Sequence, residues 1–319
     1  MSLPAVVLVG GEGTRLRPLT EKTPRPMLPL LGRPLLEYTF DHLRSGGVDR
    51  AVLACGYLPT QIEQHFGPRY DGLALDYRVE PEPLGTGGAI RFGAENFDGT
   101  FLALNGDSLR EADIGALVDF HRSMGAKATI LLARVPDPAR YGLVRQDAQG
   151  RVTAFVEKPE PSQVDTDLIN AGLYVLEPEV LDLVPGDRAV SIERDVFPAL
   201  VEEGTLHALA LPGYWLDVGT PARYLQAHLD LLNRRGGIDV DPTAEIGPET
   251  VLVPPLQVEA GAQIQRDARI GPCVALGADS QVGRRGVVRF SAVLADAQIG
   301  AGVRMARTIV APEIGVMTP

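Results

Sequence analysis

The chain has 319 residues, 45% of them hydrophobic, so it is long enough for two domains and apolar enough for a globular core. Acidic residues (41) outnumber basic ones (30), and the net charge of −11 argues against general nucleic-acid binding. We see no signal peptide and no apolar run long enough to span a membrane, so we expect a cytoplasmic protein without membrane contact. The spacing of Cys55 and Cys273 fits no metal site or redox motif, so we expect both to be buried thiols.

The first predicted strand, Pro4–Val9, leads into a glycine-rich turn. Three glycines occur there within four residues: Gly10, Gly11 and Gly13. Successive N–H groups in such a turn form a concavity that binds anions, and Arg15 and Arg17 add positive charge, so a triphosphate is the expected ligand. The turn is not a P-loop, because it lacks G-x-x-x-x-G-K-[ST], and Leu16 breaks the G-x-G-x-x-G pattern.

The longer string G-G-E-G-T-R-L-R-P-L-T, followed by T-P-R-P-M-L-P, resembles the signature loop of the sugar-1-phosphate nucleotidyltransferases. The resemblance implies that the loop binds a nucleotide through Gly10, Gly11, Gly13 and Thr14. It also implies that Arg15 and Arg25 are catalytic and neutralise phosphate charge. Relatives usually carry Lys where Arg25 stands, and an arginine keeps the charge but has a longer, planar, forked side chain.

Strand and helix signals alternate after the loop. The pattern predicts helices over residues 33–43, 60–66, 87–96 and 114–124 and strands over 50–55, 75–79 and 101–104. Such alternation is typical of a doubly wound, Rossmann-like α/β domain. Ligands of these domains bind beyond the carboxyl ends of the strands, so we give most weight to motifs that follow strands.

Glu80 opens the segment E-P-E-P-L-G-T-G-G-A, which resembles the base-recognising segment of the same family and implies that Gly85 and Thr86 also bind the nucleotide. Relatives that transfer thymidylyl or uridylyl groups tend to carry Gln where Glu80 stands. A carboxylate only accepts hydrogen bonds, and guanine offers two adjacent donors where thymine offers one. Glu80 therefore favours guanine, and the alternative is a solvated Glu at a strand end.

Asp107 ends the strand 101–104 in the string N-G-D, and Asp217 lies in W-L-D-V-G-T. An Asp at a strand end is often only a turn former. Nucleotidyl transfer, however, needs a hard divalent cation held by one or two carboxylates and by phosphate oxygens. Both strings resemble the family, and the resemblance implies that Asp107 and Asp217 are catalytic residues that bind Mg²⁺ at the reacting phosphates.

The middle of the chain resembles the sugar-binding part of the family. Strands are predicted over residues 141–144 and 151–156, and the strings E-K-P and I-N-A-G-L-Y follow them. An exposed charged turn is the alternative interpretation of E-K-P. The residues that the resemblance assigns to the sugar phosphate are Gly142, Glu157, Lys158, Asn170 and Gly172.

After a predicted helix over residues 221–232 and a predicted linker over 234–237, the composition changes and the only aromatic residue is Phe290. Aliphatic residues then recur at six-residue intervals, which is typical of a hexapeptide left-handed parallel β-helix. The pattern predicts a register slip at Ile299 and an irregular last coil. The nine aliphatic positions are Ile246, Leu252, Val258, Ile264, Ile270, Leu276, Val282, Val288 and Leu294.

The repeat itself carries no candidate general base. Acyltransferases with such β-helices generally use a His, and all five histidines of this chain precede the repeat. We therefore expect an assembly or regulatory module, with an exposed final coil that favours a homo-oligomer. The predicted domains are a nucleotidyltransferase domain over residues 1–235 and the β-helix over 236–319.

The resemblance is closest to the mannose-1-phosphate guanylyltransferase branch, also called GDP-mannose pyrophosphorylases. It implies that a nucleoside triphosphate, most simply GTP, reacts with a sugar 1-phosphate, mannose 1-phosphate, to give GDP-mannose and pyrophosphate. One alternative is a glucose-1-phosphate thymidylyl-, uridylyl- or adenylyltransferase. Another, suggested by Arg25, is a catalytically weak regulatory subunit that binds a nucleotide sugar.

Overall fold

The computed structural model describes residues 3–156, 159–312 and 314–318. The chain divides into two compact units, each defined by the contacts among its own residues. The first unit contains the residues up to Glu12 together with Leu36–Trp215, and the second contains Gly13–Leu35 and the chain from Leu216 onward. The division cuts the glycine-rich loop, because Gly10 and Gly11 belong to the first unit, whereas Gly13 and the segment after it pack in the same unit as the C-terminal repeat. The predicted domain division at residue 235 follows the change in composition instead, and it stays a prediction.

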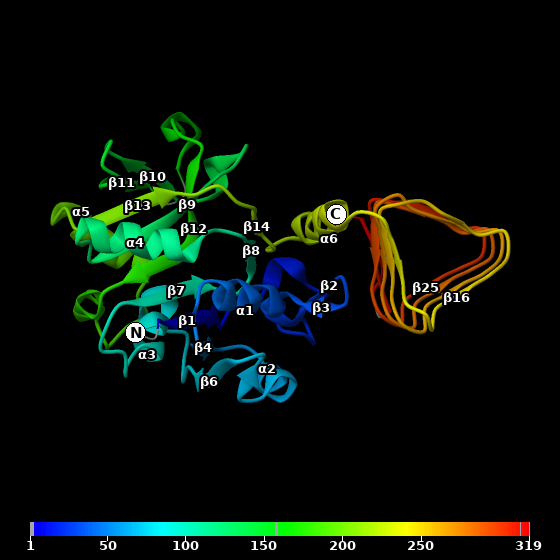
Figure 1. Cartoon of the computed structure of the whole chain (residues 1–319), viewed down its shortest axis with the longest axis horizontal. Helices are drawn as coiled ribbons and strands as arrows, with labels where there is room; N and C mark the ends of the chain where they lie inside the picture. Colours follow the sequence, from blue (N-terminus) through cyan, green and yellow to red (C-terminus); the bar gives the residue numbers. More distant parts are fainter. Residues whose placement is uncertain (1–2, 157–158, 313, 319) are drawn as a thin grey trace. The chain divides into compact units, whose positions relative to one another are not determined.

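The first half of the first unit alternates strands and helices as the apolar pattern predicts (Figure 1). The helix predicted over residues 87–96 begins two residues earlier and ends at Gly93, and the others agree within two residues. The elements are β1 (Pro4–Val9), α1 (Leu35–Ser45), β4 (Arg50–Cys55), α2 (Pro59–Phe66), β5 (Arg69–Tyr70), β6 (Leu73–Val79), α3 (Gly85–Gly93), β7 (Phe101–Asn105), β8 (Ser108–Arg110) and α4 (Ile114–Met124).

The second half of this unit is richer in strands. A π-helical turn, η6 (Ile192–Val196), precedes α5 (Phe197–Glu202). Three 3₁₀ turns lie in the connections: η3 (Pro138–Arg140), η4 (Pro161–Gln163) and η5 (Pro178–Leu183). The strands are β9 (Ala128–Arg134), β10 (Leu143–Gln146), β11 (Val152–Val156), β12 (Leu168–Leu176), β13 (Leu206–Ala210) and β14 (Trp215–Asp217), and the chain passes into the second unit within β14.

One ten-stranded sheet forms the centre of the first unit. Its strand order is β11-β10-β12-β7-β1-β4-β6-β5, and β9 pairs with β12 and β13. The four strands β7, β1, β4 and β6 are mutually parallel, whereas β12 runs antiparallel to β7. Ala5, Val6 and Val7 of β1 are fully buried, as expected of a parallel strand that is covered on both faces. The predicted doubly wound α/β fold is therefore confirmed.

The second unit begins at Gly13 with the loop of residues 13–35, which carries Arg15 and Arg25, and continues in α6 (Pro221–Arg235). The loop contains two 3₁₀ turns, η1 (Thr14–Leu16) and η2 (Arg25–Met27), and a hairpin of β2 (Pro29–Leu30) with β3 (Arg33–Pro34). Thr220 caps the start of α6, and the helix ends at Gly236, where φ is +69°. The prediction of a linker over residues 234–237 was wrong for Arg234 and Arg235, because these cations form the last helical turn and complement its dipole.

The repeat forms stacked coils with three parallel ladders, coloured yellow to red in Figure 1. The fold is the predicted left-handed parallel β-helix, in which equivalent aliphatic residues stack from coil to coil: Ile246 pairs with Ile264, and Ile264 with Val282. The ladder strands are β15 (Ile238–Val240), β16 (Glu245–Ile246), β17 (Val251–Leu252), β18 (Leu256–Val258), β19 (Gln263–Ile264), β20 (Arg269–Ile270), β21 (Val274–Leu276), β22 (Gln281–Val282), β23 (Val287–Arg289), β24 (Ser291–Val293), β25 (Gln298–Ile299), β26 (Arg304–Ala306) and β27 (Ile309–Ala311).

The register slips earlier than predicted. Leu276 pairs with Val293, which is 1% exposed, while Leu294 is only half-buried. The reason is that three residues separate Ile270 from Val274, whereas only two separate their partners in the next coil, Val288 and Ser291, so every later position moves by one. Ile299 therefore pairs with Val282 and is buried, and no slip occurs there. After Ala311 the chain turns back, and β28 (Gly315–Met317) pairs antiparallel with β27 and covers its edge.

Both cysteines are buried and form no disulfide, as predicted. None of the described helices combines the length and the apolar character that crossing a bilayer would need.

His228 of α6 is predicted to make the protein acid-sensitive. Its side chain is 2% exposed, and burial lowers its pKa from 6.5 to about 4. The folded protein keeps this imidazole neutral, whereas the unfolded chain takes up a proton below pH 6.5. The neutral His228 therefore makes its full contribution to the free energy of unfolding above pH 6.5. This contribution, about 3 kcal/mol, is lost as the pH falls towards 4.

Urea unfolding at several pH values between 7.5 and 4 measures this effect. We expect His228→Phe to lose less stability on acidification than the parent, and the exposed His65→Phe to behave like the parent. Equal acid losses in all three proteins would contradict the assignment.

Candidate active site

The four parallel strands β1, β4, β6 and β7 end at one edge of the sheet, where ligands of this class of fold bind. A cavity of about 500 Å³ opens there, within the first unit. It contains five of the predicted nucleotide-binding residues, whereas Gly13 and Thr14 belong to the second unit. The lining residues are Leu8, Gly10, Gly11, Glu12, Gly56, Tyr57, Glu80, Pro81, Glu82, Pro83, Gly85, Thr86 and Ala89.

Two glycines let the strand ends approach each other at this cavity. A Cβ atom on Gly56 would lie 2.7 Å from the carbonyl oxygen of Gly10. A Cβ atom on Gly10 would lie 3.1 Å from Oε1 of Glu80. Side chains at these two positions would therefore push the first strand away from its neighbours and occupy the space beside Glu80.

Glu80 is half-buried at the end of β6. Its Oε2 atom accepts a hydrogen bond from the backbone N–H of Leu84, at 3.0 Å. Burial raises the pKa of the Glu80 carboxyl, and the Leu84 N–H lowers it in part. The remaining acceptor capacity of the carboxylate lies in the cavity, where it suits a ligand edge that presents N–H donors.

Gly85 and Thr86 start α3 and pack against the segment of residues 190–193. A Cβ atom on Gly85, where φ is +73°, would lie 2.5 Å from the carbonyl oxygen of Val190. The Thr86 hydroxyl donates to Oε2 of Glu193 at 2.8 Å and accepts from the N–H of Ile192 at 2.9 Å. Thr86 lines the cavity, but its hydroxyl is used in hydrogen bonds that join α3 to the segment of residues 190–193.

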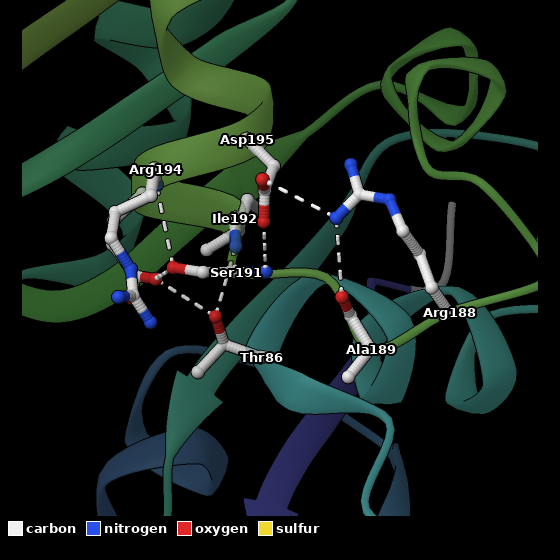
Figure 2. A network of polar contacts seen from close by, with 8 residues as sticks. Thr86, Arg188, Ala189, Ser191, Ile192, Arg194 and Asp195 are labelled. Atoms are coloured by element: carbon white, nitrogen blue, oxygen red, sulfur yellow. Dashed lines mark hydrogen bonds and ion pairs between the residues drawn. The ribbon is translucent and has the colours of Figure 1, made fainter.

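Figure 2 shows the polar contacts that order the residue 188–195 segment. Ser191 donates its backbone N–H to Asp195 Oδ2 at 2.7 Å and accepts from the N–H of Arg194 at 3.3 Å. Arg188 forms an ion pair with Asp195, with an N–O distance of 3.5 Å. These caps stabilise the π-helical turn that presents Glu193 to Thr86.

Glu193 also connects this wall to the predicted sugar-binding segment. The buried Tyr174 hydroxyl donates to Glu193 Oε1 at 3.2 Å and accepts from Nδ2 of Asn170 at 2.8 Å. Oδ1 of Asn170 in turn accepts from the N–H of Gly172 at 2.9 Å. Sequence reasoning missed Glu193, for which the string S-I-E-R-D was the local signal, and it included Tyr174 only as the last residue of I-N-A-G-L-Y, without a role.

Three of the predicted sugar-binding residues lie together. The backbone N–H of Asn170 donates to the carbonyl oxygen of Gly142 at 2.9 Å. Gly172 has a φ of +66°, and a Cβ atom there would lie 2.5 Å from Nδ2 of Asn105. The structure thus places this irregular part of β12 beside the carboxyl end of β7. The other two predicted residues, Glu157 and Lys158, lie outside the described residues.

Asp107 follows β7 in a tight turn. A Cβ atom on Gly106 would lie 2.7 Å from Cγ1 of Val9, so only glycine fits there. The Ser108 hydroxyl donates to Oδ1 of Asp107 at 3.3 Å. Arg110, which sequence reasoning did not single out, closes the turn by donating from Nη2 to the Asn105 carbonyl oxygen at 2.9 Å. Burial lowers the pKa of Arg110 to about 10.

Arg15, Arg25 and Asp217 gather in the second unit. A Cβ atom on Gly219 would lie 2.7 Å from Nη2 of Arg15 and 3.0 Å from each carboxylate oxygen of Asp217. Burial lowers the pKa of Arg25, while the Asp217 charge raises it and the Arg15 charge lowers it. The three charges therefore act on one another, and the carboxylate stands as counter-charge to the two guanidinium groups.

Gly13 allows the loop to close on this cluster. Its φ is +64°, and a Cβ atom there would lie 3.1 Å from Cβ of Arg25 and 3.1 Å from Cγ2 of Thr20. The buried Thr20 hydroxyl donates to the carbonyl oxygen of Gly13 at 2.8 Å. The neighbouring Thr14 begins the 3₁₀ turn that carries Arg15.

The carboxylates fit only one kind of metal site. Over residues 3–156, 159–312 and 314–318, no three His, Cys, Asp or Glu side chains come together as metal ligands. A closed protein cage for a metal is therefore not present in this part of the chain. Mg²⁺ is typically held by one or two carboxylates and completed by substrate phosphates, and this donor set suits Asp107 or Asp217. Because they belong to different units, their sharing of one ion stays a prediction.

Comparison with known proteins agrees with this site. Residues 4–234 match the family model described as nucleotidyl transferase. The chain belongs to the nucleotidyl transferase family. The matched range begins at β1 and ends within α6, so it contains the glycine-rich loop, the cavity and Asp217.

Relatives within the nucleotidyl transferases include curated enzymes. The chain is 41% identical to a mannose-1-phosphate guanylyltransferase of Mycobacterium tuberculosis over 84% of this chain and 76% of that protein. It is 34% identical to mannose-1-phosphate guanylyltransferase 1 of Arabidopsis thaliana, over 85% of this chain and 81% of that protein. The crystal structure of HddC from Yersinia pseudotuberculosis is similar with a TM-score of 0.62 and 31% identity, over 70% of this chain and 97% of that one.

Proposed function

We propose that the chain catalyses the Mg²⁺-dependent reaction of GTP with mannose 1-phosphate to give GDP-mannose and pyrophosphate. The observation that carries the base assignment is the Glu80 carboxylate in the cavity at the ends of the parallel strands. It accepts hydrogen bonds only, and guanine presents the N1–H and N2–H₂ donors side by side. The names of the 41% and 34% identical relatives support the same substrate pair.

The reaction needs no nucleophile from the protein. The sugar phosphate oxygen attacks the α-phosphorus, the bond to the β-phosphate oxygen breaks, and pyrophosphate leaves with that electron pair. Catalysis then rests on orientation and on charge neutralisation. Arg15 and Arg25 neutralise the β- and γ-phosphates and the leaving pyrophosphate. Asp107 and Asp217 would hold Mg²⁺, which would supply further charge neutralisation at the reacting phosphates.

The sugar phosphate is proposed to bind at Gly142 and at Asn170 and Gly172 of β12, with Glu157 and Lys158. The Asn170 side chain is used by Tyr174 and by the N–H of Gly172. Its role in this proposal is therefore to hold the left-handed Gly172 backbone in place. Glu157 would accept from sugar hydroxyls, and Lys158 would hold the phosphate.

Arg25 favours one alternative function. Relatives usually carry Lys at this position, so a regulatory subunit that binds a nucleotide sugar with weak turnover is the second candidate. The sequence supports an active enzyme instead, because a site that had lost its catalytic function would be expected to have lost some of the motif residues. All of these are present: Gly11, Gly13, Arg15, Asp107, Lys158 and Asp217.

Pyrophosphate release with Mg²⁺ tests the proposal. Mannose and glucose 1-phosphates are each combined with GTP, dTTP, UTP and ATP. We expect the highest kcat/KM for mannose 1-phosphate with GTP. A preference for glucose 1-phosphate with dTTP, UTP or ATP would keep the chemistry and overturn the assigned substrates. Binding of GDP-mannose without release from any pair would identify the regulatory alternative.

A further inference from the structure

We propose that the β-helix positions the phosphate-binding loop of this enzyme. Its residues Gln257 and Glu259 hold the turn at Leu31 and Gly32, between β2 and β3, and this turn sets the place of Arg25. Both are positioning residues, because they act through the loop. The inference rests on the proposed function only for the role of the loop in catalysis.

A polar contact fixes the Leu31 carbonyl. Nε2 of Gln257 donates to the carbonyl oxygen of Leu31 at 3.3 Å, and Gln257 is 8% exposed. Arg235, at the end of α6, donates from Nη1 to Oε1 of Gln257 at 3.1 Å and so orients the amide. The side-chain amide of Gln257 thus bridges the helix that follows Asp217 and the loop that carries the arginines.

An apolar contact buries the Leu31 side chain. Leu31 is 8% exposed and packs with Leu232 of α6 and Ala275 of the β-helix, with Leu231 at the edge. Leu31 also has a φ of +48°, which a branched side chain adopts only where its surroundings hold it. The turn therefore keeps its shape through contacts with the β-helix and α6.

Glu259 lies against the backbone of Gly32. Gly32 has a φ of +77°, and a Cβ atom there would lie 2.7 Å from Oε1 of Glu259. Oε2 of Glu259 accepts from the N–H of Ala278 in the next coil, at 3.1 Å. The carboxylate is thus anchored in the β-helix, and a side chain at position 32 would have to displace it from this anchor.

The turn is joined to the arginine cluster by a short run of backbone. The hairpin pairs Leu30 with Arg33, and the N–H of Leu35 donates to the carbonyl oxygen of Leu28 at 3.0 Å. The N–H of Leu28 donates to the carbonyl oxygen of Arg25 at 3.1 Å, which closes the 3₁₀ turn of Arg25. A shift of the Leu31–Gly32 turn therefore moves the Arg25 backbone that packs on Gly13.

Gly32→Ala is the decisive variant, with Gly47→Ala as its matched control. Gly47 has a φ of +78°, but a Cβ atom there would meet nothing within 4 Å. Both variants carry the same backbone strain, and only the first displaces the turn from Glu259. We expect Gly32→Ala to lower kcat/KM for the triphosphate about ten-fold or more, with a smaller effect on the KM of the sugar phosphate, and Gly47→Ala to keep the parent's values.

Two further measurements complete the test. Gly32→Ala with Glu259→Ser is expected to recover most of the lost activity while the mass in solution stays that of the parent. Hydrogen exchange without substrate is expected to be faster over residues 13–30 in Gln257→Leu than in the parent, which tests the positioning even if the proposed reaction is wrong. Equal effects of the two glycine variants, or unchanged exchange in Gln257→Leu, would overturn the inference.

Discussion

Asp217→Ala is expected to lower kcat about 10³-fold while GTP still binds. The carboxylate is the counter-charge of Arg15 and Arg25 in the second unit and a proposed Mg²⁺ ligand. Its loss would weaken the hold on Mg²⁺ and with it the charge neutralisation that the ion would supply in the transition state, whereas the two arginines still attract the triphosphate. Steady-state pyrophosphate release and GTP binding measured without metal separate these effects.

Asp107→Ala and the double variant show whether the two carboxylates share one ion. If they do, the variant that lacks both carboxylates loses no more activity than either single variant, because the effects of mutating residues that act as a unit do not add. Asp98→Ala removes an exposed carboxylate outside the proposed site and is the control, with parental turnover expected. Parental turnover of Asp217→Ala would contradict the assignment.

Glu80→Gln is expected to lower kcat/KM for GTP about 100-fold and to raise that for dTTP or UTP relative to GTP. Gln keeps an acceptor for the Leu84 N–H, but it replaces the carboxylate acceptor in the cavity by a group that also donates. Hydrogen bonds to a charged partner are worth about 1.5–3 kcal/mol each, which corresponds to this loss. Turnover of each triphosphate with mannose 1-phosphate measures the change.

Glu82→Gln is the matched control for this variant. Glu82 lines the same cavity two residues further on and is exposed, so the same loss of charge there is expected to leave the preference for GTP unchanged. The same shift in both variants would mean that net charge in the cavity, and not contact between Glu80 and the base, determines the choice of triphosphate.

The positions of the strand-end motifs were predictable from the sequence. Apolar runs such as Pro4–Val9 and Arg50–Cys55 are local signals, and parallel strands bring their carboxyl ends to one edge of a sheet. Gly10 and Glu80 therefore had to meet there once the α/β alternation was recognised. The hexapeptide period likewise predicted the β-helix, because each inward aliphatic residue stacks on the next coil.

The partners of these motifs were not predictable. The hydrogen bond from Thr86 to Glu193, the closure of the Asp107 turn by Arg110 and the register change before Val293 all depend on contacts or corner lengths that leave no periodic signal. Arg110 is a buried cation, and composition alone places such a residue at the surface.

By itself the sequence determined the alternating helices and strands up to residue 124, the two kinds of fold and the motifs that meet at the ends of the parallel strands, because these depend on residue type and spacing. Only the tertiary structure decided that the loop of residues 13–35 packs with α6 and the β-helix, through Leu31, Gly32 and Gln257. Residues 31 and 257 are far apart in the chain, and their contact depends on how the folded segments pack. No local pattern encodes that choice.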